Sequence, residues 1–173
     1  MNKTALNILL TALVLIPAQA VFFNNMVLFN VAVPIIFIYI IISLPITYSA
    51  ELAMTIGFVS GLAVDILSDT PGMNALCATL LAFVQRGVFH LYMSNDIDLA
   101  EQRPSPRNMG AGAFMKFTLT MALIYCLMVF GIEAIQVFNL RMYVLRVVFS
   151  TIYSFIIIYA IAGLTASSRE KRL

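Results

Sequence analysis

The sequence predicts an all-α integral membrane protein, a bundle of six transmembrane helices that forms a single domain. Two observations carry this prediction. The chain of 173 residues is 62% hydrophobic and only 10% charged, with a mean hydropathy of +0.98, whereas soluble domains carry about 25% charged residues. Its apolar runs are also continuous and reach the roughly 20 residues that a helix needs to cross a bilayer. This composition excludes a cytosolic enzyme, a nucleic-acid-binding protein and a secreted disulfide-stapled domain.

Polar and turn-forming residues set the boundaries of the predicted spans. The uncharged stretch 4–50 is too long for one span, and the asparagines within 23–30 divide it into two helices. Later boundaries fall at the turn 69–72 and at the charged loop 94–108, which we place in the cytoplasm. We therefore expect helices over residues 5–22, 31–48, 52–68, 73–92, 114–132 and 144–164, followed by a basic cytoplasmic tail over 165–173.

Both N-terminal spans contain residues that bear on where they end. In the second span, Pro34 lies in the first turn, where a missing N–H costs nothing, and Pro45 stops or kinks the helix near its end. In the first span, Lys3, the apolar run that follows and the small residues around Ala20 also resemble a signal peptide. Cleavage after Ala20 would leave five spans and keep every later loop on the same side. We expect the first helix to be retained.

The distribution of lysine and arginine predicts the orientation in the membrane. With both termini in the cytoplasm, eight of the ten basic residues lie on or near the inner side, and only Arg141 and Arg146 lie outside. We therefore predict an N-in, C-in topology. The inner residues, among them Arg86 and Lys116, anchor the helices among anionic headgroups.

The third span carries the most distinctive pattern in the chain. Small or acidic residues recur there at every fourth position, which places them on one helical face: Ala53, Gly57, Gly61, Asp65 and Asp69. Because glycine has no side chain, Gly57 and Gly61 allow another helix to approach closely. Two interpretations remain open, namely ordinary packing inside the bundle and a groove for the helix of a partner protein.

Asp65 lies about one turn inside the outer end of the third span. An ionised carboxylate costs roughly 2.5–3.5 kcal/mol near the middle of the bilayer and less toward the interface. We expect Asp65 to point inward and to pair with Arg146, the nearest outer cation in the sixth span. The alternative is that Asp65 snorkels to the headgroups while Asp69 caps the helix. Glu133 and Arg141 join these residues in a predicted outer charged cluster.

The sequence contains no arrangement typical of catalysis or of a bound cofactor. The outer cluster has no nucleophile beside a base, and His90, the single histidine, falls on the opposite side of the membrane. Cys77 and Cys126 lie in apolar runs without the spacing of metal ligands, which favours a role as small core residues. We therefore predict no catalytic residue, no cofactor, no metal site and no enzymatic activity.

One succession of residues resembles a known family. The run Pro34–Pro45, PIIFIYIIISLP, is followed by Gly57–Ser68, GFVSGLAVDILS, and then by a Pro-Gly turn and an apolar run. This succession resembles the bacterial rod shape-determining protein MreD family. Members of that family are small six-span proteins with a proline-bounded second helix and a third helix of the form G-F-x-x-G-x-x-x-D-[IL]-x-S.

The resemblance covers residues 31–90 and places the family motif on Gly57, Gly61 and Asp65, with Asp69 adjacent. Glu133 lies where the family often has an acid. The resemblance also implies a fold similar to the substrate-binding subunits of energy-coupling-factor transporters.

The function that the resemblance implies is a non-enzymatic scaffold of the cell-shape and peptidoglycan elongation complex in the bacterial inner membrane. Its expected partner is the single-span periplasmic protein MreC, and through it MreB filaments, a RodA-type glycosyltransferase and a class B penicillin-binding protein. The alternative is the substrate-binding subunit of a vitamin-type transporter, which needs a roomy outer pocket with aromatic and polar walls. The chain has no tryptophan, and the outer halves of its spans are mostly aliphatic, which favours the scaffold.

Overall fold

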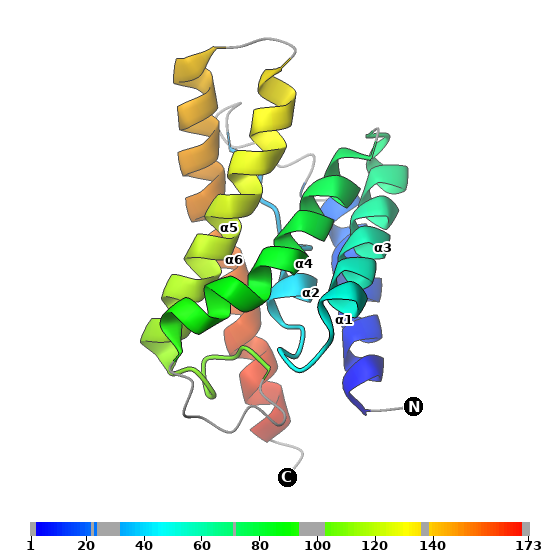
Figure 1. Ribbon diagram of the computed structural model, residues 1–173, viewed down its shortest axis with the longest axis vertical. Coiled ribbons are helices and arrows are strands. Elements are labelled where there is room, and N and C mark those ends of the chain that lie inside the picture. The colour runs from blue at the N-terminus through cyan, green and yellow to red at the C-terminus, as the bar shows by residue number, and fades with distance from the viewer. Residues whose placement is uncertain are drawn as a thin grey trace.

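The structure, a computed structural model, describes residues 3–21, 23, 32–70, 72–93, 103–135 and 139–170. The fold of this part of the chain is helical, and its two termini lie at the same end of the molecule (Figure 1). In chain order the helices are α1 (Lys3–Val21), α2 (Tyr39–Ile42), α3 (Ala50–Ser68), α4 (Met73–Tyr92), α5 (Ala111–Ala134) and α6 (Leu140–Glu170).

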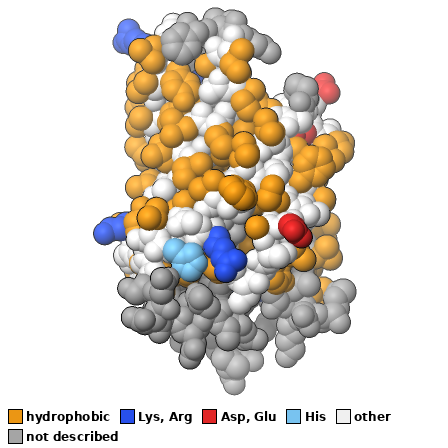
Figure 2. Space-filling view, viewed as in Figure 1, with side chains coloured by type: hydrophobic (Ala, Val, Ile, Leu, Met, Phe, Trp, Pro, Cys, Tyr) orange, Lys and Arg blue, Asp and Glu red, His pale blue; other side chains and the backbone are white. Residues whose placement is uncertain are grey.

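Four of the described helices are long and apolar enough to cross a membrane. They are α3, α4, α5 and the part of α6 from Leu140 to Gly163, and α1 adds a shorter apolar stretch, Leu6–Val21. Large hydrophobic side chains remain exposed along all of these helices. Figure 2 shows them as a continuous band between charged side chains at the two ends. Such a surface suits lipid rather than water, and the chain is a multi-pass helical membrane protein.

The structure confirms the predicted helices on both sides of the turn at 69–72 and the core of the fifth one. The helix predicted over 73–92 is α4 (Met73–Tyr92). The helices predicted over 52–68 and 114–132 lie inside α3 and α5. The last helix is longer than predicted, because α6 continues to Glu170 over 31 residues, or about 46 Å at 1.5 Å per residue.

The helix predicted over 31–48 is wrong. Within residues 32–48 the structure has only the four-residue helix α2, and the rest of this stretch is irregular or in turns and bends. Pro34 and Pro45 cannot donate backbone hydrogen bonds. Six isoleucines between them add β-branched side chains that lose rotamer freedom in a helix. We call residues 32–48 the central segment, because it passes through the middle of the molecule between the long helices (Figure 1).

Two helical hairpins surround the central segment (Figure 1). One consists of α3 and α4 and the other of α5 and α6, while α4 also packs against α5 and α1 against α3. Aromatic edge-to-face contacts join these parts: Phe37 lies 5.5 Å from Tyr125 and Phe89 lies 6.0 Å from Phe117, measured between ring centroids. The central segment is the most deeply buried part of the core.

A tight turn reverses the chain between α3 and α4. Helix α3 begins after Ser49, whose side chain accepts a hydrogen bond from the Leu52 N–H. It ends at Asp69, which takes the left-handed conformation with φ of 53°, and Gly72 takes it again with φ of 75° just before α4. Asparagine, aspartate and glycine tolerate this conformation best. The reversal brings the last turn of α3 against the first turn of α4.

Candidate functional site

The Asp65 side chain is buried at the start of α4, with only 2% of its surface exposed. Its carboxylate accepts four hydrogen bonds. The backbone N–H groups of Asn74 and Ala75 donate at 3.1 and 2.8 Å, and the Asn74 Nδ2 donates at 2.9 Å. The Thr70 hydroxyl donates the fourth bond. The prediction that Asp65 points inward is confirmed.

The first turn of α4 explains why a carboxylate belongs at this place. The first N–H groups of a helix have no partner within the helix, and the helix dipole places a partial positive charge there. The N-cap residue of α4, Gly72, has no side chain that could accept from them. Asp65 supplies the missing acceptor from the neighbouring helix, so a negative charge is held at depth by neutral donors.

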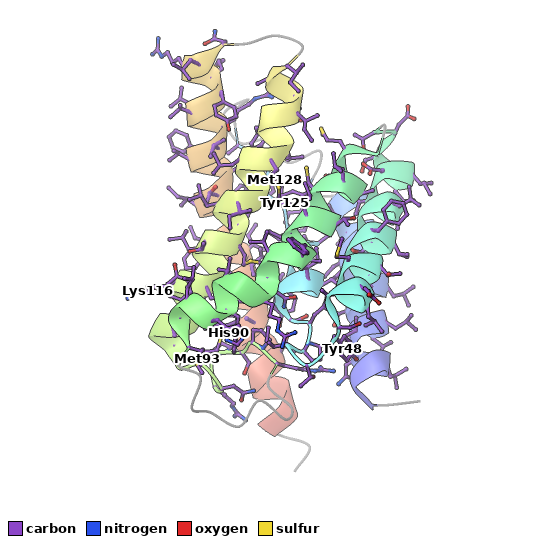
Figure 3. The ribbon with its side chains drawn as sticks, viewed as in Figure 1. Tyr48, His90, Met93, Lys116, Tyr125 and Met128 are labelled. Carbon is purple, nitrogen blue, oxygen red and sulfur yellow. The ribbon has the colours of Figure 1, made fainter. Side chains whose placement is uncertain are left out.

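A chain of polar contacts extends from Asp65 to α5. The Tyr125 hydroxyl donates to Asn74 Oδ1 at 2.6 Å, and Asn74 Nδ2 also lies 3.3 Å from the Thr70 hydroxyl. Figure 3 shows Tyr125 at mid-height on α5. We call Asp65, Thr70, Asn74 and Tyr125 the acid network. It joins α3, α4 and α5 through side chains that are buried or half-buried.

The predicted pair between Asp65 and Arg146 is wrong. Arg146 Nη1 instead bonds Glu133 Oε2 at 2.8 Å, and Asp65 has no ion pair with any residue that the structure describes. The reason is geometric: Asp65 is directed at the start of α4, whereas Arg146 lies on α6 beside the adjacent end of α5. Asp69, on the predicted face, is the exposed C-cap of α3, and Arg141 is exposed and outside the Glu133–Arg146 pair.

The glycine face of α3 is covered by α4. A Cβ atom at Gly57 would lie 2.7 Å from the Ala78 carbonyl oxygen, and one at Gly61 would lie 2.6 Å from the Ala75 Cα. Real side chains do not approach backbone this closely, so both positions require glycine. Of the two interpretations, this arrangement is the packing within the bundle, and α4 occupies the place that the helix of a partner would take.

Side chains of α1 and α6 satisfy the non-helical backbone at one end of the central segment. The Gln19 amide donates to the Pro34 carbonyl at 3.0 Å and accepts from the Ile36 N–H at 2.7 Å. The Ser150 and Ser154 hydroxyls of α6 accept from the N–H groups of residues 33 and 35 at 3.0 and 2.8 Å. Each of these three side chains is buried.

Helix α4 holds the other end of the central segment, where the Gln85 amide donates to the Leu44 carbonyl at 3.2 Å. Such external partners are required because lipid cannot hydrogen-bond free backbone groups at membrane depth. The sequence analysis missed these four polar residues. Their signal in the sequence is weak, because other polar side chains occur on the same helices, for example Arg86 next to Gln85 and Thr151 next to Ser150.

A cavity of about 170 Å³ lies where the central segment, α1, the acid network and α5 meet. Four polar residues contribute to its wall, namely Gln19, Thr70, Asn74 and Glu133, and the remaining lining side chains are apolar. Glu133 connects the cavity to Arg146, whose guanidinium also lies 5.9 Å above the Phe130 ring. The predicted outer residues therefore divide into a buried acid, a half-exposed ion pair and two exposed side chains.

The remaining chemistry-bearing residues lie apart from this site. Cys77 and Cys126 are buried and form no disulfide, as expected of small core residues. His90 and Lys116 lie toward the end that carries both termini (Figure 3). The buried polar contacts of this site join the helices, and a small cavity lies beside the Glu133–Arg146 ion pair. No family model, no curated protein and no solved structure matches this chain.

Proposed function

We propose that this protein is a non-enzymatic scaffold of the MreD type in the bacterial inner membrane. One observation carries the proposal: the residues of the resemblance form one folded unit. The central segment packs on the α3–α4 hairpin, Gly57 and Gly61 set the approach of the two helices, and Asp65 holds the start of α4. Motif residues that contact one another support the resemblance more strongly than the same residues would if they lay far apart in the fold.

The proposed topology has six crossings, with both termini in the cytoplasm. Five crossings are helices, and the central segment makes the second crossing in a mostly non-helical form. Two observations support this orientation. Both termini lie at one end of the molecule (Figure 1), and the exposed side chain of Lys116 lies toward that same end (Figure 3). Basic residues are typical of the cytoplasmic side.

The scaffold proposal assigns the MreC-type partner to the lipid-facing surface of the bundle. The glycine face cannot receive it without displacing α4. Single photocrosslinking residues, one for each exposed face, locate the contact. Suitable exposed positions are Leu13, Ile66, Phe83, Leu127 and Ile156. We expect one or two adjacent positions to capture a single-span periplasmic protein, while the others capture only lipid.

Depletion in a rod-shaped host tests the function itself. We expect cells to become round as lateral wall synthesis fails, and we expect the captured partner to link MreB, a RodA-type glycosyltransferase and a class B penicillin-binding protein. Normal rod shape after complete depletion, together with lipid alone at all five positions, would contradict the scaffold proposal. Re-expression of the wild-type chain is the control for the depletion.

The alternative function, a vitamin-type transporter subunit, would require the cavity to hold the vitamin. Pockets for drug-sized ligands measure about 300–1,000 Å³, whereas this cavity measures about 170 Å³. A vitamin panel separates the two functions, because a ligand at 100 times its dissociation constant adds about 2.7 kcal/mol of stability. We expect no vitamin to raise the melting temperature of the purified protein.

A further inference from the structure

We propose that the cavity beside Glu133 and Arg146 binds a small zwitterion with an apolar body, of the class of the apolar α-amino acids. This inference goes beyond the scaffold function and does not rest on it. The cavity measures about 170 Å³, close to the roughly 150 Å³ of a cavity that holds benzene. It therefore has room for an isobutyl or benzyl group, whereas a larger cofactor would not fit.

The interior of the cavity suits an apolar group. Its walls include Phe37, Val64, Val129 and Phe130. The other polar residues of the wall are already engaged in the protein: Thr70 and Asn74 bond within the acid network, and Gln19 holds the central segment. A ligand side chain would accordingly gain dispersion contacts with the apolar walls.

The rim of the cavity is a charged pair, of which Glu133 lines the wall and Arg146 lies just outside it. Glu133 lines the cavity, and Arg146 bonds to it while lying over the Phe130 ring. The two side chains are 40% and 44% exposed, so a ligand can reach them. A guanidinium has five N–H donors and a carboxylate has two acceptor oxygens. The bond between Arg146 and Glu133 uses one N–H of Arg146 and the Oε2 atom of Glu133, so the other N–H groups and Oε1 are not used by this bond.

This rim selects a zwitterion over a singly charged molecule. A ligand ammonium group can bond Glu133 Oε1 while its carboxylate bonds the remaining N–H groups of Arg146, so that four charges alternate in sign. A ligand with only one charge would meet the opposite charge of the pair but also its like charge. The Glu133–Arg146 ion pair stays intact when a ligand binds, because the ligand uses only the hydrogen-bond donors and the acceptor oxygen that the pair leaves free.

Calorimetric titration of the purified full-length protein in lipid nanodiscs tests the proposal. The probes are L-leucine and L-phenylalanine, with 4-methylpentanoate and 3-methylbutylamine as analogues that lack the ammonium or the carboxylate. We expect one or both amino acids to bind. Each analogue of leucine should bind about 10- to 100-fold more weakly, the factor for one hydrogen bond to a charged group.

Variants at the rim complete the test. Glu133→Gln and Arg146→Gln should each weaken amino-acid binding by the same factor of about 10 to 100, and Arg141→Gln, at an exposed arginine outside the pair, should leave it unchanged. Because all three side chains are exposed, we expect the variants to fold, and an unchanged melting temperature checks this. Absence of binding at millimolar amino acid, equal binding of the analogues, or a phospholipid retained in the cavity would each overturn the proposal.

Discussion

Replacing Asp65 tests whether a carboxylate, rather than shape alone, holds the start of α4. The substitution Asp65→Asn keeps the size of the side chain but removes its charge and turns one acceptor oxygen into a donor. Because all four groups around this side chain are donors, an amide cannot satisfy them all. We expect the α3–α4 hairpin to lose stability without a change in its fold.

The size of the loss follows from which donors can find another partner. The Thr70 hydroxyl and the Asn74 side chain can rotate, but the backbone N–H groups of Asn74 and Ala75 are fixed by α4. A buried donor without a partner costs about 1–3 kcal/mol. Asp65→Asn leaves one such N–H without a partner, so the expected loss of unfolding free energy is about 1–3 kcal/mol. Asp65→Ala leaves two, so the expected loss of unfolding free energy is about 2–6 kcal/mol.

The two buried cysteines provide the assay. Cys77 and Cys126 are fully buried, so a thiol-reactive fluorophore reports their exposure as the purified protein unfolds on heating or in denaturing detergent. The matched control is Asp69→Asn, which makes the same chemical change at an exposed acid four residues further along. If Asp65→Asn destabilises the protein no more than Asp69→Asn, the acid network does not hold α4, and our reasoning fails.

Two further predictions use the same assay. Gly61→Ala places a Cβ against the backbone of α4 and should cost about 1–3 kcal/mol by overpacking. The control Gly87→Ala has open space around it and should be neutral or stabilise the helix by up to about 1 kcal/mol. Equal effects of the two substitutions would refute the close approach of α3 and α4. Gln19→Leu removes the partner of three buried backbone groups in the central segment, two at close distance and the Phe37 N–H at 3.4 Å. The two close bonds alone should make it cost about 2–6 kcal/mol. Thr11→Ala in the same helix, which removes only an exposed bond within the helix, should change stability by less than about 1 kcal/mol. A loss for Gln19→Leu as small as that for Thr11→Ala would show that other groups support this backbone.

Sequence reasoning located the helices on both sides of the turn at 69–72. This turn marked the end of α3 and the start of α4, because Pro, Gly and Asp favour reversals and the flanking runs are apolar. The same reasoning placed Gly57 and Gly61 on one face with Asp65. It did not identify α4 as the neighbour of that face, since spacing along one helix carries no information about which helix lies opposite.

The sequence did not reveal the partner of Asp65, because that partner is not a charged side chain. The actual partner is the first turn of a helix, a group that every sequence contains and that no residue type marks. Gly72 offers an indirect signal: an N-cap glycine leaves the helix start without a side-chain acceptor, and an acid one turn before the preceding helix ends can reach it. Treating the first turn of a helix as a partial positive charge, which attracts a carboxylate, predicts this contact.

The central segment was mistaken for a helix because hydropathy measures burial in an apolar medium and not backbone conformation. A buried non-helical segment and a transmembrane helix have the same apolar composition. Two prolines and six isoleucines within 34–45 weigh against a helix, but the decisive information lies elsewhere in the chain. It is the set of buried polar residues on α1, α4 and α6 that supply the missing hydrogen bonds.

The two polar systems of this protein converge on α4. The acid network fixes its first turn to α3 and α5, and Gln85, three turns later, fixes the central segment to its other half. The central segment cannot satisfy its own backbone, so it becomes stable only when α1, α4 and α6 are already in place around it. A change that displaces α4, such as a larger residue at Gly61, should therefore release both systems together. A change at the Glu133–Arg146 pair, which touches neither system, should leave the core intact.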